Sequence, residues 1–235
     1  MFVSDVHLTS ADPAGVERFV RFLDGPAQAC SRLVIVGDLF DVWVTPEQRR
    51  DPGLAVVFDA LGALPRRIDV GFVEGNRDFA ATPELRAAGL RPLADEVLVE
   101  AGGRRVVATH GDLLCTRDVR YQAFRRIART AAVRHLLRAV PARTAAGVGR
   151  AARRGSAMET AKKAYGDMGL APLAVASILR RHEADALVCG HVHWGQRFAI
   201  EVDGRDRDVV VLGAWESAPS YAVLDGDGLR FLAWV

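Results

Sequence analysis

The sequence is poor in cysteine. Cys30, Cys115 and Cys189 are the only three in 235 residues, and no two of them form a Cys-x-x-Cys pair. An odd number of thiols without such a pair does not support a disulfide framework or a thiolate metal site. We therefore expect all three cysteines to be reduced, as in a protein of the cytoplasm.

Long apolar runs are also missing. No stretch approaches the roughly 18 to 20 residues that a membrane-spanning helix needs. Met1 leads directly into Phe2-Val3-Ser4-Asp5, without the basic and apolar regions of a secretory signal. Half of the residues are hydrophobic and 26% are charged, which is typical of a globular protein. These features predict a cytoplasmic protein with one α/β domain, possible at this length.

Acidic residues are scarce in the middle of the chain. Between Arg117 and Lys163 there are thirteen lysines and arginines but only two acids, Asp118 and Glu159. Such segregation favours a basic face for an anionic partner, namely nucleic acid, a phosphorylated substrate or a membrane surface. A solvated, arginine-rich helix face is the plainer alternative. Few aromatic residues lie among the arginines to stack on bases, so we expect no nucleic-acid partner.

Apolar periodicity predicts alternating strands and helices. A basic helical region from Arg117 to about Arg181 interrupts this order, between the fifth or sixth strand and the strand at 186–189. The predicted strands are 2–3, 33–36, 68–73, 97–99, 105–108, 186–189, 209–212 and 221–224, and the other predicted helices are 13–23, 54–64 and 83–88.

Residue types that bind metals follow five of these strands. They are Asp5 and His7, then Asp38, Asn76 and His110, then His191 and His193. In extended backbone, residues two apart point to the same side, so each of the two pairs suits one centre. An isolated pair of this kind is more often a surface or core feature. The prediction depends on all seven residues lying at strand ends of one sheet.

This set of imidazoles, carboxylates and an amide suits Mn²⁺, Fe²⁺ or Zn²⁺ better than a pure calcium site. Seven ligands are too many for one ion, but two ions that share a carboxylate would use them all. Asp38 lies between the two groups in the sequence and is the expected bridge. The residues therefore predict a dinuclear metal centre.

The order Asp-x-His, Gly-Asp, Gly-Asn-Arg-Asp, His-Gly-Asp, Gly-His-x-His resembles the calcineurin-like metallophosphoesterases. Most members have histidine after the asparagine, where this chain has Arg77. Further stretches make the chain similar to one branch, the UDP-2,3-diacylglucosamine pyrophosphohydrolases of lipid A synthesis. These stretches are Gly37-Asp38-Leu39-Phe40-Asp41, His110 to Thr116, Tyr121 to Arg125, and Leu212-Gly213-Ala214-Trp215.

The resemblance implies an α/β fold, a four-layer αββα metallophosphoesterase sandwich in a single domain over residues 1–235, with a basic helical insertion, or cap, at about 117–181. It also implies two Mn²⁺ ions, with Fe²⁺ or Zn²⁺ as alternatives. One ion would be held by Asp5, His7, Asp38 and His193, and the other by Asp38, Asn76, His110 and His191. Water would attack the α-phosphorus and release UMP and 2,3-diacylglucosamine 1-phosphate, with Asp38, Asn76, Arg77 and His110 as the catalytic residues.

The same resemblance implies the contacts of the lipid substrate. The expected substrate-binding residues are Asn76, Arg77, Asp118, Tyr121, Ser156, Thr160, Lys163 and His191. Thr160 replaces a typical asparagine, and Trp194-Gly195 replaces a common Arg-Pro. The stripe of Val133, Leu136, Leu137 and Val140 would form an apolar trough or pack on the core. The arginines would hold the protein to the anionic cytoplasmic face of the inner membrane.

Three questions stay open at this point. The enzyme would act instead on another nucleotide diphosphate or phosphodiester if the substrate contacts differ. A metallophosphoesterase fold kept as a binding scaffold is the alternative from a different class, and the complete ligand set argues against it. Asp78 and Asp112 either orient ligand histidines or cap turns.

Overall fold

The computed structural model describes residues 1–141, 144, 147 and 169–234, and its described strands form two sheets. The first sheet has the order β11-β10-β1-β2-β3-β4, in which β1 to β4 are parallel. The second has the order β5-β6-β7-β9-β8, in which β6, β7 and β9 are parallel. The bounds are β1 Phe2–Val3, β2 Arg32–Val36, β3 Asp69–Val73, β4 Arg91–Pro92, β5 Glu96–Ala101, β6 Arg104–Thr109, β7 Ala186–Cys189, β8 Gln196–Val202, β9 Arg205–Val211, β10 Ser220–Asp225 and β11 Gly228–Ala233.

Two of the helices begin at an aspartate that caps them. Asp12 accepts a hydrogen bond from the backbone N–H of Gly15, and Asp51 accepts one from Gly53, each just before a proline that opens a helix. The helices are α1 Pro13–Asp24, α2 Pro52–Ala63, α3 Thr82–Ala87, α4 Val119–Ala128, α5 Ala131–Arg138 and α7 Pro172–Arg181, and the short 3-10 turns are η1 Pro26–Ala29, η2 Pro46–Arg50, η3 Phe79–Ala81 and η4 Asp112–Leu114.

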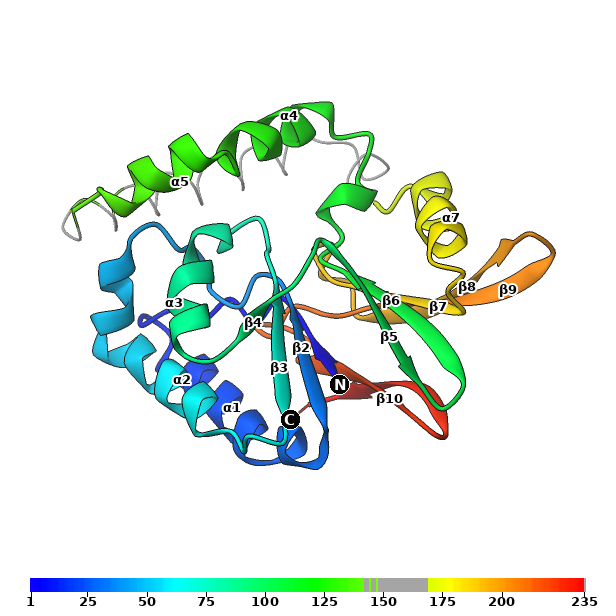
Figure 1. The fold of residues 1–235 in the computed structure, drawn as a ribbon, viewed down its shortest axis with the longest axis horizontal. Helices are drawn as coiled ribbons and strands as arrows, with labels where there is room; N and C mark the ends of the chain where they lie inside the picture. The colour runs from blue at the N-terminus through cyan, green and yellow to red at the C-terminus, as the bar shows by residue number, and fades with distance from the viewer. Residues whose placement is uncertain (142–143, 145–146, 148–168, 235) are drawn as a thin grey trace.

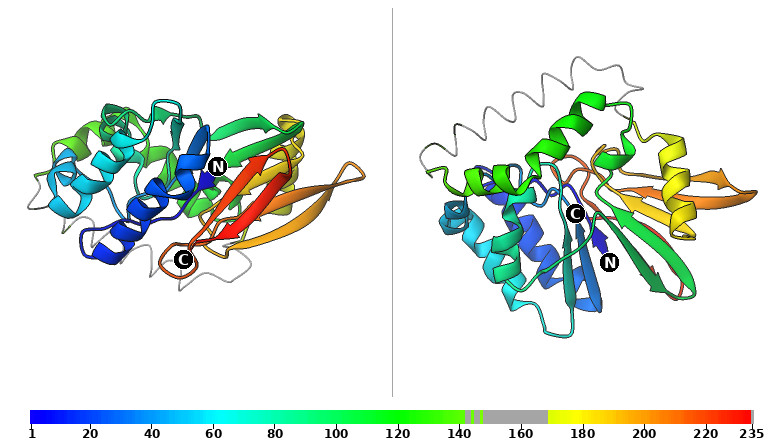
Figure 2. Two further views of the ribbon diagram at one scale, coloured as in Figure 1. Left: turned by 90° about the horizontal axis from the view of Figure 1, so that it is seen from below. Right: turned by 45° about the horizontal axis from the view of Figure 1, so that its top comes forward.

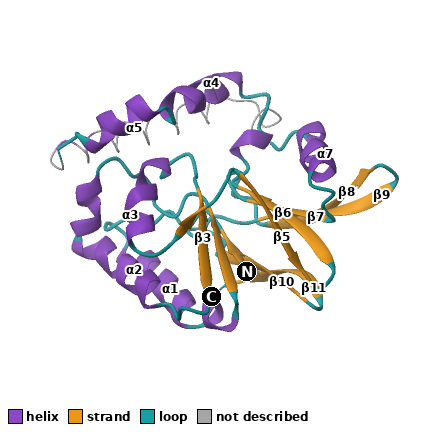
Figure 3. Ribbon diagram, viewed as in Figure 1, coloured by secondary structure: helices purple, strands orange, loops and turns teal. Residues whose placement is uncertain are grey.

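The strand period of two divides the core into layers. In β2, Leu33 and Ile35 pack with α1 and α2, whereas Val34 and Val36 face the second sheet. In β6, Val107 packs with α7 on the outer side of that sheet. Helices therefore cover the outer face of each sheet, and the predicted αββα sandwich is confirmed (Figure 3).

Helix α7 lies inside the range predicted for the basic insertion, yet Val175 and Leu179 bury it against the second sheet. The described helices outside the sandwich are α4 and α5, which run across the top of the molecule (Figure 1). Their apolar stripe is split, because Leu137 packs on the core while Leu136 is 68% exposed. None of the described helices has the length and apolar character needed to cross a membrane.

Three strands were not predicted. β4 has two residues, one of them a proline, and β8 lies at a sheet edge with most of its residues exposed. β11 is the other edge strand of the first sheet. Edge strands carry a weak apolar pattern because one side of their backbone and much of their surface face water. The β8–β9 hairpin extends from the body of the protein (Figure 2).

Candidate metal centre

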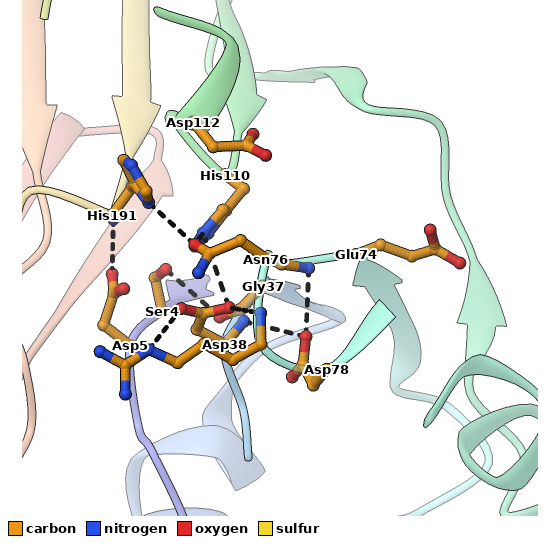
Figure 4. Close-up of polar contacts among 12 residues, drawn as sticks. Ser4, Asp5, Gly37, Asp38, Glu74, Asn76, Asp78, His110, Asp112 and His191 are labelled. Atoms are coloured by element: carbon orange, nitrogen blue, oxygen red, sulfur yellow. Dashed lines mark hydrogen bonds and ion pairs between the residues drawn. The ribbon is translucent and has the colours of Figure 1, made fainter. Parts of the chain in front are cut away.

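The candidate ligands come from two sheets, so the prediction of one sheet was wrong. Strands β1, β2 and β3 of the first sheet lead into Asp5, His7, Asp38 and Asn76. Strands β6 and β7 of the second sheet lead into His110, His191 and His193. The residues still meet, because the carboxyl ends of these parallel strands lie close together. Figure 4 shows how Asp5, Asp38, Asn76, His110 and His191 lie relative to one another.

Asp38 lies between two histidines from different sheets. Its Oδ2 is 3.6 Å from Nε2 of His7, and its Oδ1 is 3.6 Å from Nε2 of His110. Ligand atoms of Asp5, Asp38 and His110 all lie within 4.8 Å of one another. This is the arrangement that a carboxylate shared by two cations requires.

Asp5 connects the first strand to the loop after β7. Its Oδ2 accepts a hydrogen bond from the backbone N–H of His191 at 2.9 Å, which fixes the carboxylate. Its Oδ1 is 3.2 Å from Nε2 of His193 and 3.8 Å from Nε2 of His7. Asp5, His7 and His193 therefore form a group that can hold one cation.

Asn76 faces the other two histidines. Its Oδ1 lies 3.0 Å from Nε2 of His110 and 2.9 Å from Nδ1 of His191. The carbonyl oxygen of Val36 is 3.0 Å from Nδ1 of His110 and can only accept, so that nitrogen carries the proton and Nε2 is left for a ligand bond. Burial lowers the pKa of His191 to about 4, which favours the neutral imidazole that metals bind.

Three buried atoms of this site have no hydrogen-bond partner. They are Oδ1 of Asp5, Nε2 of His7 and Oδ2 of Asp38. A buried unpaired polar atom costs about 1–3 kcal/mol, so a cluster of them calls for a ligand. Burial opposes the charge of Asp38, but His110 and His7 hold its pKa well below the usual range. The residues present therefore fit divalent cations, because an ionised carboxylate and unpaired donor atoms are turned to one point.

From the sequence, we expected extended backbone for the pairs Asp5/His7 and His191/His193. The structure shows a different backbone conformation at these residues. Positive φ angles occur at Asp5 (52°), His7 (55°), Asp38 (51°), His191 (70°) and His193 (63°). These five are among seven such non-glycine residues in the part of the chain that the structure describes. Each costs on the order of 1–3 kcal/mol and persists only where the surroundings demand it. The paired side chains thus converge through left-handed turns rather than through a strand.

Two glycines allow the loops to approach. Gly37 has φ of +81°, and a Cβ there would lie 2.5 Å from Nδ1 of His110. A Cβ on Gly75 would overlap Oδ1 of Asp38. Only glycine therefore permits the loops after β2 and β3 to lie this close.

Arg77 is tied to the centre at three points. Its backbone N–H donates to Oδ1 of Asp38 at 2.9 Å, and its Nε lies 3.5 Å from Oδ2 of the same residue. Its NH1 lies 2.8 Å from Oδ1 of Asp41, a partner that sequence reasoning missed although Asp41 belongs to the quoted motif. The side chain remains 26% exposed.

The two remaining aspartates have different tasks. Asp78 accepts backbone N–H groups of Leu39 at 2.6 Å and Gly75 at 3.1 Å, and burial beside Asp38 raises its pKa to about 7. It braces the loops, as in the turn-capping alternative. Asp112 accepts from the hydroxyl of Tyr121 at 2.6 Å and from Nε of Arg125 at 2.7 Å, and so fixes α4 to the core.

The predicted substrate contacts are only partly described. Tyr121 lies near the centre, with its ring centroid 5.8 Å from that of His191. Asp118 caps α4 by accepting from the N–H of Tyr121 at 3.1 Å. Ser156, Thr160 and Lys163 lie outside the described residues. Sequence reasoning also missed Glu216, whose Oε1 is 3.7 Å from Nδ1 of His7, because only the three-dimensional fold brings it there.

The two-sheet sandwich with this site defines a metal-dependent phosphoesterase, and the comparisons agree. The chain belongs to the calcineurin-like phosphoesterase family, whose model matches residues 1–195. The family predicted from the sequence motifs is thereby confirmed.

Within this family, the chain is similar to proteins named for one substrate. A UDP-2,3-diacylglucosamine hydrolase of Aeromonas salmonicida is 35% identical over 92% of this chain and 85% of that protein. One of Bordetella pertussis is 37% identical over 97% of this chain and 92% of that protein. Among solved structures, an archaeal phosphodiesterase has a TM-score of 0.45 and 15% identity over 99% of this chain and 97% of that one.

Proposed function

We propose that this chain hydrolyses the pyrophosphate bond of UDP-2,3-diacylglucosamine, releasing UMP and 2,3-diacylglucosamine 1-phosphate for lipid A synthesis. One observation carries the proposal: seven side chains of types that can ligate a metal converge in a chain that aligns over 92% or more of its length with relatives named for this substrate. The complete donor set and the unpaired buried atoms also argue against a scaffold without metals.

The proposed ligands divide into two groups that share Asp38. One ion would be held by Asp5, His7, Asp38 and His193, and the other by Asp38, Asn76, His110 and His191. Mixed nitrogen and oxygen donors suit Mn²⁺, Fe²⁺ or Zn²⁺, and we propose Mn²⁺ because the resemblance to the family implies it. When bound, such a pair acidifies water and neutralises charge on the phosphoryl group.

The protein side chains would orient the diphosphate. The Arg77 guanidinium, held by Asp38 and Asp41, is a fixed donor that suits phosphate oxygens. Asn76, the neighbour of Arg77 in the chain, and His191 from the second sheet would contact the same group. Attack on the α-phosphorus would follow from this orientation, with the glucosamine 1-phosphate as the leaving group.

Helix α4 supplies a surface for the lipid part. A cavity of about 310 Å³ is lined by Leu113, Thr116, Val119, Gln122, Ala123 and Arg126. The amide of Gln122 donates to the carbonyl of Asp112, so this cavity adjoins the residues that follow β6. The apolar part of this lining, Leu113, Val119 and Ala123, would contact an acyl chain.

The domain plan and location follow from this substrate. We propose one domain over residues 1–235, whose basic insertion contacts the glucosamine head through Asp118, Tyr121, Ser156, Thr160 and Lys163. The outer face of α4 exposes Phe124 (59%) and Ile127 (64%) beside arginines. This combination supports binding to the anionic cytoplasmic face of the inner membrane.

The decisive experiment is a product assay. Purified protein with Mn²⁺ is expected to release UMP and the glucosamine 1-phosphate lipid from UDP-2,3-diacylglucosamine in detergent. Activity confined to simple phosphodiesters would reject the substrate and leave the hydrolytic chemistry standing. Incubation in ¹⁸O-water tests the site of attack, since the label is expected in UMP.

Membrane binding has its own test. Flotation with anionic vesicles is expected to carry the protein, and Phe124→Asp is expected to weaken this binding. Leu173→Asp on α7 is the matched control, because Leu173 is 84% exposed on a different helix. Equal flotation with zwitterionic vesicles would remove the electrostatic part of the proposal.

A further inference from the structure

The arginines of α4 and α5 are not all turned to solvent. Arg125 pairs with Asp95 and Asp112, Arg134 with Glu74, and Arg138 with Glu84. Arg129, between the two helices, pairs with Asp95. Part of the basic charge that composition suggested for an anionic partner is thus paired with acidic residues of the protein itself.

Two of these arginines meet the loop that carries Asn76 and Arg77. We call residues Glu74–Phe79 the Asn76 loop. The NH2 group of Arg129 donates to the carbonyl oxygens of both Glu74 and Gly75, each at 3.1 Å. These are the two peptide carbonyls immediately before Asn76.

Arg129 is itself held in place. Its NH1 donates to Oδ1 of Asp95 at 2.8 Å, and its NH2 lies 3.5 Å from Oδ2 of Asp112. The side chain is only 12% exposed. A planar guanidinium reaches two carbonyls and a carboxylate at once, which an ammonium cannot match.

Arg134 holds both ends of the same loop. Its two terminal nitrogens donate to the Glu74 carboxylate at 2.8 and 2.6 Å, and NH1 also donates to the carbonyl of Phe79 at 2.7 Å. Its guanidinium lies 5.5 Å from the centroid of the Phe79 ring. The loop therefore begins and ends on arginine contacts from the helices above it.

The inner side of the loop touches the candidate metal centre. Asn76 Oδ1 faces the ring nitrogens of His110 and His191, and the N–H of Arg77 donates to Asp38. A displacement of about 1 Å at such a group is enough to cost about 100-fold in rate. The position of the Asn76 loop therefore links the contacts of α4 and α5 to the geometry of the candidate metal centre.

We propose that Arg129 and Arg134 are positioning residues that hold the Asn76 loop and so couple α4 and α5 to the metal centre. The inference rests on the proposed function, in which Asn76 is a ligand and Arg77 contacts phosphate. Neither arginine touches a candidate ligand side chain directly. Their effect on the centre passes through the backbone carbonyls of Glu74 and Gly75 and the carboxylate of Glu74.

The test compares Arg129→Ala, Arg134→Ala and Arg129→Lys with Arg180→Ala in the full chain. Arg180 is a matched control, because it also lies on a helix and pairs with an aspartate, Asp203, but belongs to α7. Mn²⁺ binding is measured by titration calorimetry, and amide hydrogen exchange is measured without metal. The two alanine variants are expected to bind one Mn²⁺ about 10- to 100-fold more weakly and to exchange faster within residues 74–79. The lysine variant should lie in between, and Arg180→Ala should match the unmodified protein.

Two results would overturn the inference. One is an Arg129→Ala protein with unchanged Mn²⁺ affinity and unchanged exchange in the loop. The other is faster exchange spread evenly along the chain, which indicates a general loss of stability. If the unmodified protein does not hydrolyse the lipid substrate while Arg129→Ala still loses Mn²⁺, the proposed function fails and the inference stands.

Discussion

The NH1 nitrogen of Arg77 lies 2.8 Å from a carboxylate oxygen of Asp41. The Asp41 side chain is 9% exposed, so the pair is largely shielded and keeps one geometry. Asp38 lies on the other side of the same guanidinium, 3.5 Å from its Nε. A cation held between two carboxylates is fixed before any phosphate arrives, which limits the cost of ordering it on binding.

Replacing Arg77 by lysine tests this arrangement. Lysine keeps the charge but loses the planar fork, and a hydrogen bond to a charged group contributes about 1.5–3 kcal/mol. We expect kcat/KM for UDP-2,3-diacylglucosamine to fall about 10- to 100-fold. Arg91→Lys is the control, because Arg91 pairs with Asp69 at an exposed position. A change below twofold at Arg77 would contradict the role.

Asp38→Asn tests the shared carboxylate. The amide keeps the shape but removes the charge between His7 and His110, so both cation positions should weaken. Loss of a residue that only supports a metal ligand costs up to about 100-fold in activity. Asp38 is proposed as a ligand itself, so we expect turnover to fall by more than that. Metal content by mass spectrometry should fall below one ion per chain. Asp69→Asn, at the opposite end of β3, should retain both ions, and normal turnover in Asp38→Asn would sink the two-metal interpretation.

Gly75→Ala tests the close approach of the loops. The added Cβ would overlap Oδ1 of Asp38, so the loop must shift, at a cost of about 1–3 kcal/mol in unfolding free energy. Gly226→Ala is the control, since nothing lies within 4 Å of the Cβ position there. Denaturant unfolding and Mn²⁺ titration measure both effects. Equal behaviour of the two variants would argue that the loops are not tightly apposed.

Metal removal should lower thermal stability. Three buried polar atoms gain partners when a cation binds, and a ligand at 100 times its Kd adds about 2.7 kcal/mol. For a chain of this size, that corresponds to a Tm increase of about 5–11 °C. Scanning calorimetry with EDTA and then with Mn²⁺ measures the shift. Asp38→Asn should show little of it, and an equal shift in that variant would place the cation elsewhere.

The sequence predicted the layers of the fold better than the geometry of the candidate site. Buried strands such as Leu33 to Val36 have a strong apolar signal, and an aspartate or histidine directly after a strand is visible in one dimension. The sequence does not show which strands belong to which sheet, because the apolar run in β6 resembles that in β2. The left-handed backbone at Asp5 and His191 could not be predicted either, because glycine is the residue type that usually indicates a positive φ and neither residue is glycine.

The ion-pair partners of the arginines could not be predicted from the sequence either. Arg129 and Glu74 are 55 positions apart, and nothing in either neighbourhood indicates the other. The composition suggested a basic surface, whereas the fold turns Arg125, Arg129 and Arg134 inward. Composition counts charges but does not reveal which side of a helix meets an acid.

The hydrogen bond from His191 to Asp5 joins residues that are 186 positions apart. On the ribosome, Asp5, His7, Asp38 and Asn76 emerge long before the histidines that follow β7. The early part of the chain therefore contributes two carboxylates, one amide and one imidazole, and the other candidate imidazoles follow strands of the second sheet. The proposed ligand set is therefore complete only after the second sheet has been synthesised and has packed on the first.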